Sequence, residues 1–180
     1  MRRRVIRPMR LSAAGLGVLA MSWLLIAPIA DAATARADLK ESGGVKVGEA
    51  SLQDTPQGVK ISATFTDLPA GEHAFHVHAV GRCEPPFESA GGHFNPTNRQ
   101  HGRDNPQGPH AGDMPNLQVT DRKAATIEVV VRDVSLESGP NRLLDGDGAS
   151  LVVHERADDY VTDPAGNAGA RIACGVITAR

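Results

Sequence analysis

The chain has 180 residues and a formal net charge of −2 at pH 7, and its length predicts one domain. Without its arginine-rich first 32 residues it keeps 14 basic and 20 acidic residues, a formal charge near −6. A chain of this charge has no general attraction for nucleic acid or for anionic membranes, which excludes proteins that bind either through a basic surface.

The first 32 residues have the pattern of an export signal. A basic start over residues 1–7 precedes the apolar run Leu11–Ala27, and Ala30–Ala32 fits a small-x-small cleavage site. An uncleaved membrane anchor is the alternative, but the Ala and Gly residues of the run make it only moderately hydrophobic. We therefore predict a cleaved signal over residues 1–32, a domain over residues 33–180, and a location in a periplasm, at the cell surface or in the medium.

The first part of this domain is predicted to consist of strands and turns. Residues 33–40 and 45–52 form two candidate strands separated by a Ser-Gly-Gly turn. Residues 59–66 give the clearest strand, because apolar and polar side chains alternate along it.

The next predicted strand contains a His-x-His pair. Alternation places His76 and His78 on one face, opposite to Phe75 and Val77. A metal bound by the two histidines would therefore lie outside the apolar core. His73 falls on the apolar face, where we expect a buried imidazole that hydrogen-bonds to the backbone.

Residues 81–116 lack regular alternation and are rich in Gly, Pro, Asn and His. A loop of this length in a small domain is expected to be functional or disordered. It contains His93, His101, His110 and Asp113, spaced as His-x7-His-x8-His-x2-Asp. Imidazoles and carboxylates suit zinc and copper(II). One such histidine alone is usually an ordinary polar residue, but these four groups together with the His-x-His pair predict a metal site.

The C-terminal part returns to strands. Residues 126–134 alternate, residues 149–155 form a strand that contains His154, and residues 171–178 form the closing strand after a second loop over residues 156–170. Seven or eight short strands with two long loops predict an all-β protein, either an antiparallel sandwich or a flattened barrel.

Cys83 and Cys174 are the only two cysteines of the chain. In an oxidising compartment a distant pair is most simply a disulfide. Metal binding by their thiolates is the alternative, and it is less favoured because neither cysteine belongs to a CxxC motif.

These motifs resemble those of the Cu,Zn superoxide dismutase family. The resemblance runs from about residue 33 to the C-terminus, and the motifs occur in the family's order. They are Gly71–His78, Gly91–Pro96, His110–Asp113, Leu151–Glu155 and Gly166–Gly175. The resemblance implies an eight-stranded antiparallel Greek-key sandwich or flattened barrel with two long functional loops.

The resemblance also implies a centre with two metal ions. The implied copper ligands are His76, His78, His93 and His154. The implied zinc ligands are His93, His101, His110 and Asp113, so that His93 bridges the two ions.

Three further roles follow from the resemblance. Asp158 matches a carboxylate that hydrogen-bonds to one ligand of each metal. Cys83 and Cys174 match the family's intrasubunit disulfide. Arg171 matches the arginine beside the copper that attracts the anionic substrate.

The implied activity is disproportionation of superoxide to dioxygen and hydrogen peroxide, in antioxidant defence outside the cytoplasm. Its cofactors are copper and zinc, and His93 and Arg171 are the catalytic residues. Superoxide is the expected small-molecule partner, with no nucleic acid, no membrane after signal removal, and a monomer or a homodimer as the assembly. The second loop has no lysine, so positive steering residues other than Arg171 are not identified.

Two interpretations compete with the enzyme: a metal-binding relative without this catalysis, and a structural sandwich held by zinc. A copper-delivery domain or a non-catalytic relative would lack one or more copper ligands or Arg171, and a copper-only relative would lack the zinc set; this chain has all of them. A structural sandwich held by zinc would not need His76, His78 and His154. We therefore favour the enzyme.

Overall fold

The computed structural model describes residues 32–180, and nearly all of their regular structure is β-strand. The export signal predicted over residues 1–32 lies outside the described residues apart from Ala32. Within the described range the only helix is the 3-10 turn η1, Glu88–Ala90, and no helix there has the length and apolar character needed to cross a membrane.

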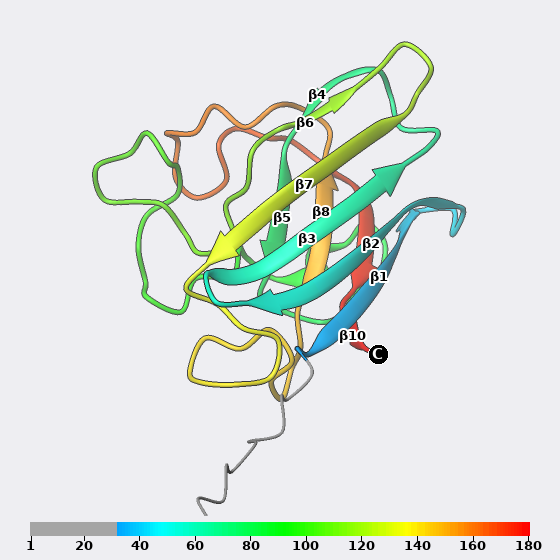
Figure 1. Cartoon of the computed structure of the whole chain (residues 1–180). Helices are drawn as coiled ribbons and strands as arrows, with labels where there is room; N and C mark the ends of the chain where they lie inside the picture. The colour runs from blue at the N-terminus through cyan, green and yellow to red at the C-terminus, as the bar shows by residue number, and fades with distance from the viewer. Residues whose placement is uncertain (1–31) are drawn as a thin grey trace, which may run out of the picture. The chain divides into compact units, whose positions relative to one another are not determined.

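Eight strands form one antiparallel sheet in the order β5-β8-β9-β1-β2-β3-β7, with β10 beside β1, and β4 and β6 form a separate pair. Figure 1 shows β1, β2, β3 and β7 in front of β5 and β8. The crossovers between non-consecutive strands are those of a Greek key, so the predicted all-β fold is confirmed. The strands are β1 (Thr34–Glu41), β2 (Lys46–Thr55), β3 (Gly58–Phe65), β4 (Gly71–His73), β5 (Phe75–His78), β6 (Leu117–Val119), β7 (Ala125–Arg132), β8 (Ser150–His154), β9 (Arg171–Val176) and β10 (Thr178–Ala179).

The apolar core lies between the two layers and follows the predicted alternation. Val59 and Ile61 of β3 are fully buried, and Phe65 is 2% exposed. The ring of Phe65 meets Phe75 of β5 edge-on, with 5.4 Å between the ring centroids. This contact joins the front layer to the strand that contains the His-x-His pair, so burial of apolar surface fixes that strand in place.

The strand predicted around the His-x-His pair is divided at Ala74. The N–H of Ala74 donates to the carbonyl of Arg156, and its carbonyl accepts from the N–H of His154. The chain therefore leaves the β4–β6 pair and joins the edge of β8 one residue later. This division, together with the short strands β6 and β10, explains why the described residues contain ten strands where seven or eight were predicted.

The predicted disulfide between Cys83 and Cys174 is confirmed, with 5.6 Å between the two Cα atoms. Cys174 lies within β9, opposite Val152 of β8. The bond therefore fastens the loop after β5 to the middle of the sheet, where Phe87 and Ala90 form a small second apolar cluster around it.

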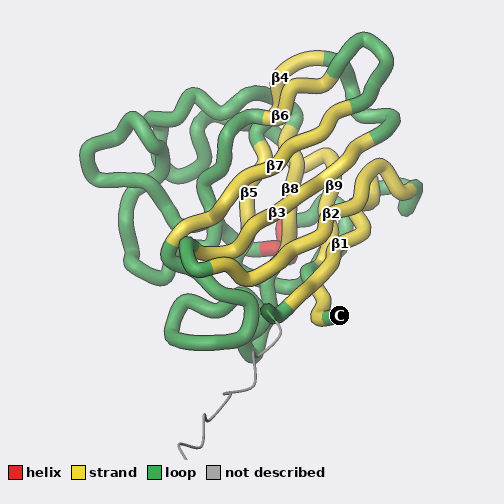
Figure 2. The backbone as a smooth tube through the Cα atoms, viewed as in Figure 1, coloured by secondary structure: helices red, strands yellow, loops and turns green. Residues whose placement is uncertain are grey.

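The two long loops gather beside β5 (Figure 2). The backbone of the first loop runs along the free edge of β5: Phe94 donates to the carbonyl of Val77 at 2.8 Å, and Val77 donates to the carbonyl of Gly112 at 3.0 Å. A Cβ atom at Gly112 would lie 2.3 Å from the Val77 oxygen, which is why glycine is needed there.

We predict that Leu52→Ala lowers the free energy of unfolding by about 2–5 kcal/mol, because Leu52 is 1% exposed and its removal leaves a cavity. Denaturant unfolding of the metal-loaded protein measures this change. Gln53→Ala, at the neighbouring exposed position of the same strand, is the control and should change stability by less than about 0.5 kcal/mol. Equal effects of the two substitutions would show that the core does not lie between the layers.

Candidate metal centre

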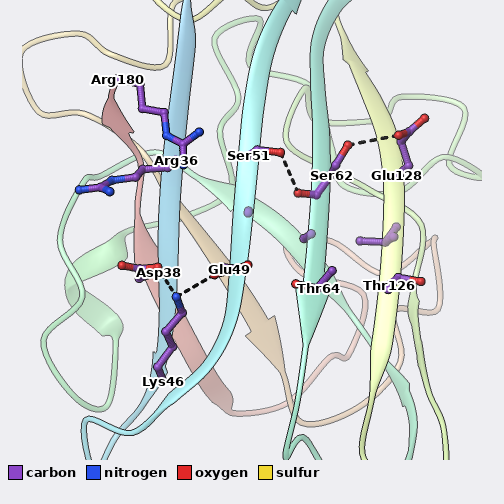
Figure 3. A pocket seen from close by; sticks show the side chains of 13 residues that line it. Arg36, Asp38, Lys46, Glu49, Ser51, Ser62, Thr64, Thr126, Glu128 and Arg180 are labelled. Atoms are coloured by element: carbon purple, nitrogen blue, oxygen red, sulfur yellow. Dashed lines mark hydrogen bonds and ion pairs between the residues drawn. The ribbon is translucent and has the colours of Figure 1, made fainter.

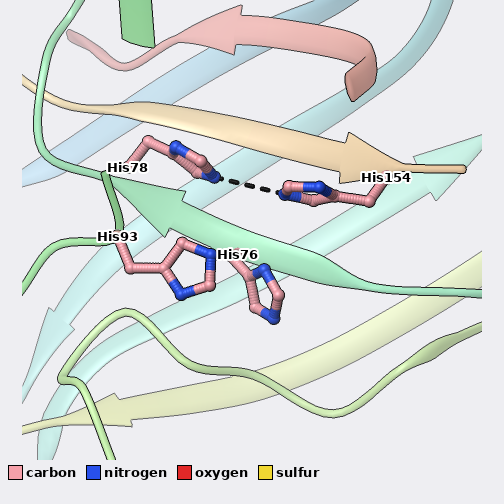
Figure 4. A group of neighbouring side chains, drawn as sticks. All are labelled: His76, His78, His93 and His154. Atoms are coloured by element: carbon pink, nitrogen blue, oxygen red, sulfur yellow. Dashed lines mark hydrogen bonds between the residues drawn. The ribbon is translucent and has the colours of Figure 1, made fainter. Parts of the chain in front are cut away.

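Four histidines form a buried group beside β5. His76 and His78 come from β5, His154 comes from the end of the neighbouring strand β8, and His93 comes from the first loop (Figure 4). The bridge between His78 and His93 brings the loop residue to the strand. Each histidine offers a ring nitrogen, and the four nitrogens lie within 4.8 Å of one another.

The strand alternation predicts the facing of His76 and His78 correctly, because Phe75 and Val77 belong to the apolar core and the two histidines do not. The histidine face is nevertheless fully buried, since the loops cover it. A loop cover of this kind excludes water and strengthens electrostatic interactions at the site.

The ring nitrogens of this group turn lone pairs toward a common point. Nδ1 of His78 donates to the carbonyl of Gly91 at 3.0 Å, which leaves its Nε2 as an acceptor 3.3 Å from Nε2 of His154. Nδ1 of His76 and Nε2 of His93 are buried and have no hydrogen-bond partner among the described residues. A buried polar atom without a partner is costly, and a metal ion that accepts these lone pairs removes the cost. The residues therefore fit a copper ion.

A second group surrounds the carboxylate of Asp113. Its Oδ1 lies 2.8 Å from Nδ1 of His93, 3.0 Å from Nδ1 of His101 and 3.4 Å from Nδ1 of His110. Its Oδ2 accepts from the backbone N–H groups of Gly102 and His110. Three imidazole nitrogens and one carboxylate are a tetrahedral donor set typical of zinc.

His93 belongs to both groups. Its Nδ1 faces Asp113, and its Nε2 is one of the two nitrogens of the first group that have no hydrogen-bond partner among the described residues. The one imidazole therefore offers a nitrogen to each of two ions.

Asp158 joins the two groups from behind. Its Oδ2 lies 2.9 Å from Nε2 of His76, and its Oδ1 lies 2.9 Å from Nε2 of His101. Each of these ring nitrogens donates to the carboxylate, so the opposite nitrogen, Nδ1, is left free to bind a metal. The close grouping of His76, His101 and Asp158 is accounted for by these hydrogen bonds and does not require a third ion.

Two residues that sequence reasoning missed hold Asp158. Asn116 exchanges two hydrogen bonds with its backbone, and the N–H of Tyr160 donates to Oδ1 at 2.6 Å. Asn116 follows Asp113 closely in the chain, but no sequence signal indicates that it meets a loop 42 residues further on.

Burial sets the protonation of the metal-free polypeptide. It lowers the pKa of His93 to about 4 and that of His154 to about 3, so both are neutral at neutral pH. Burial also disfavours the charged form of His101, but the hydrogen bonds that its ring donates to the carboxylates of Asp113 and Asp158 outweigh burial and raise the pKa of His101 to about 9. Neutral imidazole is the form that binds metal.

A pocket of about 260 Å³ opens onto the group of four histidines. It is lined by His78, His93 and His154 together with Arg171, the first residue of β9. The guanidinium of Arg171 is held by the carbonyls of Phe87 and Gly91, each at 2.7 Å. Arg171 is the only lining residue with a permanent charge, which favours an anion in the pocket, and the exposed carboxylate of Glu88 lies 3.8 Å from its Nη2.

His73 has the structural role that the sequence predicts. It is 4% exposed, its Nδ1 lies 2.8 Å from the carbonyl of His154, and its Nε2 lies 2.9 Å from the carbonyl of Pro69. The ring thus fills the space behind the metal group without joining it.

The sheet is curled and antiparallel, and its loops bury two adjoining donor sets that share one imidazole. These features define a class of β-sheet metalloproteins with a paired metal centre. The family model for copper/zinc superoxide dismutase (SODC) matches residues 42–177. The chain belongs to the copper/zinc superoxide dismutase family, a family of oxidoreductases that use copper and zinc.

Relatives with known names agree with this placement. Superoxide dismutase [Cu-Zn] 1 of Aquifex aeolicus (strain VF5) is 47% identical, and the match covers 83% of this chain and 90% of the relative. Superoxide dismutase [Cu-Zn] of Caulobacter vibrioides is 41% identical over 80% of this chain and 85% of the relative. A superoxide dismutase-like protein from Bacillus subtilis, whose crystal structure is known, has 40% sequence identity to this chain. The two structures match with a TM-score of 0.76 over 79% of this chain and 97% of that one.

We predict that Gly166→Ala weakens metal retention by about 10–100-fold, the range for loss of a residue that orients metal ligands. A Cβ atom at Gly166 would lie 1.9 Å from Oδ1 of Asp158 and 2.8 Å from Nε2 of His101, and its φ of +61° disfavours a side chain. Metal analysis after dialysis against a chelator measures the loss. Gly146→Ala is the control, since no heavy atom lies within 4 Å of its Cβ position. Unchanged retention in the Gly166 variant would show that Asp158 does not support the ligands.

Proposed function

We propose that this chain disproportionates superoxide to dioxygen and hydrogen peroxide, and that it does so at the centre described above. The main support is the pair of buried, unpartnered nitrogens, His76 Nδ1 and His93 Nε2, beside a pocket with one fixed positive charge. Membership of the copper/zinc superoxide dismutase family gives the substrate class.

The proposed ligand sets divide at His93. The copper ligands are His76, His78, His93 and His154. The zinc ligands are His93, His101, His110 and Asp113. Asp158 orients one histidine of each set.

Copper bound by its four histidines supplies one-electron chemistry, in which one superoxide is oxidised to dioxygen and a second is reduced to peroxide. Arg171 binds the anionic substrate in the pocket, because its guanidinium stays charged at any working pH and keeps N–H groups free of its two carbonyl partners. The reduced oxygen needs two protons to leave as hydrogen peroxide. When Nε2 of His93 is not bound to copper it can hold one of them, since its other nitrogen is committed to the zinc group, and the second proton comes from water.

We further propose that residues 1–32 are a cleaved export signal, that residues 33–180 are the working domain, and that the protein acts outside the cytoplasm, in a periplasm, at the cell surface or in the medium. The disulfide between Cys83 and Cys174 supports this location, because structural disulfides persist in oxidising compartments. Mass spectrometry of the exported protein identifies its first residue.

A metal-binding protein without catalysis is the alternative, and one relative, a protein of Bacillus subtilis, is named superoxide dismutase-like. The complete donor sets and Arg171 favour the enzyme. The deciding measurement is superoxide consumption by the metal-loaded protein, with metal content determined on the same sample. A protein that contains both metals and does not accelerate dismutation would contradict the proposal.

We expect Asp113→Ala to lose most zinc and to keep copper, because Asp113 supplies only the second donor set. His154→Ala is the matched variant and should lose copper while keeping zinc. Elemental analysis of both proteins after equal metal loading tests the division. Loss of copper alone from the Asp113 variant would reverse the assignment.

We expect Arg171→Glu to reduce the dismutation rate at least about tenfold with both metals bound, because steering by a local positive charge can change association rates by about 10–1000-fold. The residual rate should also respond less to added salt, which screens the attraction. Arg142→Glu is the control of equal charge change, on an exposed loop residue that does not line the pocket. Similar rates for the two variants would show that Arg171 acts only through net charge.

A further inference from the structure

A carboxylate of the second loop, that of Asp163, lies beside two histidines of the zinc donor set. Its Oδ1 accepts a hydrogen bond from the backbone N–H of His101 at 2.6 Å and lies 3.9 Å from Nε2 of His110. Both histidines belong to the donor set that includes Asp113. The second loop therefore reaches this set twice, because Asp158 also accepts a hydrogen bond from the ring of His101.

The position of Asp163 is set by the second loop itself. The carboxylate of Asp159 accepts hydrogen bonds from the N–H groups of Val161 and Thr162, at 3.0 and 2.8 Å, and from the side-chain amide of Asn167 at 2.8 Å. These bonds close a short turn that contains Asp163. None of them involves a histidine of the centre, so the turn directs Asp163 toward the zinc donor set by its own bonding.

The backbone of His101 is held on both sides. Asp163 accepts its N–H, and the side-chain amide of Asn105 donates to its carbonyl at 3.0 Å. His101 is 0% exposed, so water is a poor substitute for either partner. A buried N–H that loses its acceptor is costly. A shift of the backbone that relieves this cost would move the imidazole of His101 away from Asp113.

The ring of His110 presents its two nitrogens to two different carboxylates. Nδ1 lies 3.4 Å from Oδ1 of Asp113, within the zinc donor set, so the ring proton that remains when Nδ1 binds zinc is on Nε2, which faces Asp163. The 3.9 Å distance is too long for a hydrogen bond, so the contact is an electrostatic attraction between the polar N–H and the carboxylate. A cation at Nδ1 makes the Nε2–H group more positive and so strengthens this attraction.

We propose that Asp163 is a positioning residue for zinc, which acts through His101 and His110 and does not bind the ion itself. One oxygen fixes the backbone of His101, and the negative charge favours the ring orientation in which His110 offers Nδ1 to zinc. The inference rests on the proposed zinc ligands and concerns how firmly they hold the ion. Within residues 32–180 no hydrogen bond or ion pair joins Asp163 to the histidines of β5 and β8, so copper binding should be unaffected.

Two substitutions separate the hydrogen bond from the charge. Asp163→Asn keeps an oxygen that can accept the N–H of His101 and removes the charge, whereas Asp163→Ala removes both. In protein expressed from the full sequence and loaded with copper and zinc, Asp163→Ala should raise the zinc dissociation constant, measured by competition with a chelator, at least about tenfold. This is the lower end of the range for residues that orient metal ligands, because the side chain of Asp163 is 48% exposed. Asp163→Asn should raise the constant by a smaller factor, and neither variant should lose copper.

Asp38→Ala is the matched control. The side chain of Asp38 is 53% exposed, close to the value for Asp163, and it forms an ion pair with Lys46 at 2.8 Å on the outer face of the sheet (Figure 3). This substitution removes the same charge from the protein without changing a contact of the centre. Its zinc dissociation constant should therefore stay within about twofold of that of the unmodified protein.

Cobalt(II) in place of zinc gives a readout of ligand geometry that a loss of stability alone does not move. The visible absorption bands of four-coordinate cobalt(II) depend on the arrangement of its donors. They are measured with copper held as copper(I), whose filled d shell gives no visible bands. At full cobalt occupancy Asp163→Ala should shift or broaden the bands, and Asp163→Asn should change them less. The spectrum of Asp38→Ala should match that of the unmodified protein.

Unchanged zinc affinity and an unchanged cobalt spectrum in Asp163→Ala would refute the positioning role and leave the proposed zinc ligands intact. Loss of copper together with zinc would also refute it, because this result would assign the effect to general damage of the second loop. An unmodified protein that binds no zinc would instead contradict the ligand assignment, and the positioning role with it.

Discussion

The arrangement of the centre depends on one buried carboxylate, that of Asp158, which accepts hydrogen bonds from His76 and His101. These two histidines come from different parts of the fold, a strand of the main sheet and an irregular loop. A single side chain from the second loop thus fixes the ring orientation of a ligand in each donor set. Because the side chain is buried with the two rings, an unpaired member of this trio would be costly, so the three groups order one another.

Hydrogen bonds to a buried carboxylate also explain how loops without regular structure hold the metal-donor atoms in place. Oδ1 of Asp113 lies near one nitrogen of each of three imidazoles, and Oδ2 accepts hydrogen bonds from two backbone N–H groups. The sheet beneath contributes rigidity where it is needed, since His76, His78 and His154 stand on paired strands. Electrostatic attraction between loops and packing of the sheet therefore have separate tasks. Electrostatic attraction brings the donor atoms of the loops together. Packing of the sheet holds His76, His78 and His154 in fixed positions.

Much of this was predictable from the sequence, because two kinds of signal are local. Period-two alternation placed Phe75 and Val77 in the core and the His-x-His pair on the other face. Ligand residue types and their spacing identified six of the seven side chains that the fold gathers into the two donor sets, and the resemblance to the family added His154. The division of a strand at Ala74 could not be predicted, because it arises from hydrogen bonds to residues about 80 positions away. The support that Asn116 gives to Asp158 was hidden for the same reason.

The position of the Arg171 side chain depends on the disulfide between Cys83 and Cys174. Its guanidinium is held by the carbonyls of Phe87 and Gly91, and the loop that supplies them is tied to the sheet through Cys83. Without the disulfide, the loop is joined to the sheet only by non-covalent contacts. The guanidinium of Arg171 is then held less firmly at the pocket. The disulfide thus helps to hold the two carbonyls that position Arg171, so thiol oxidation contributes to the anion-binding geometry of the pocket.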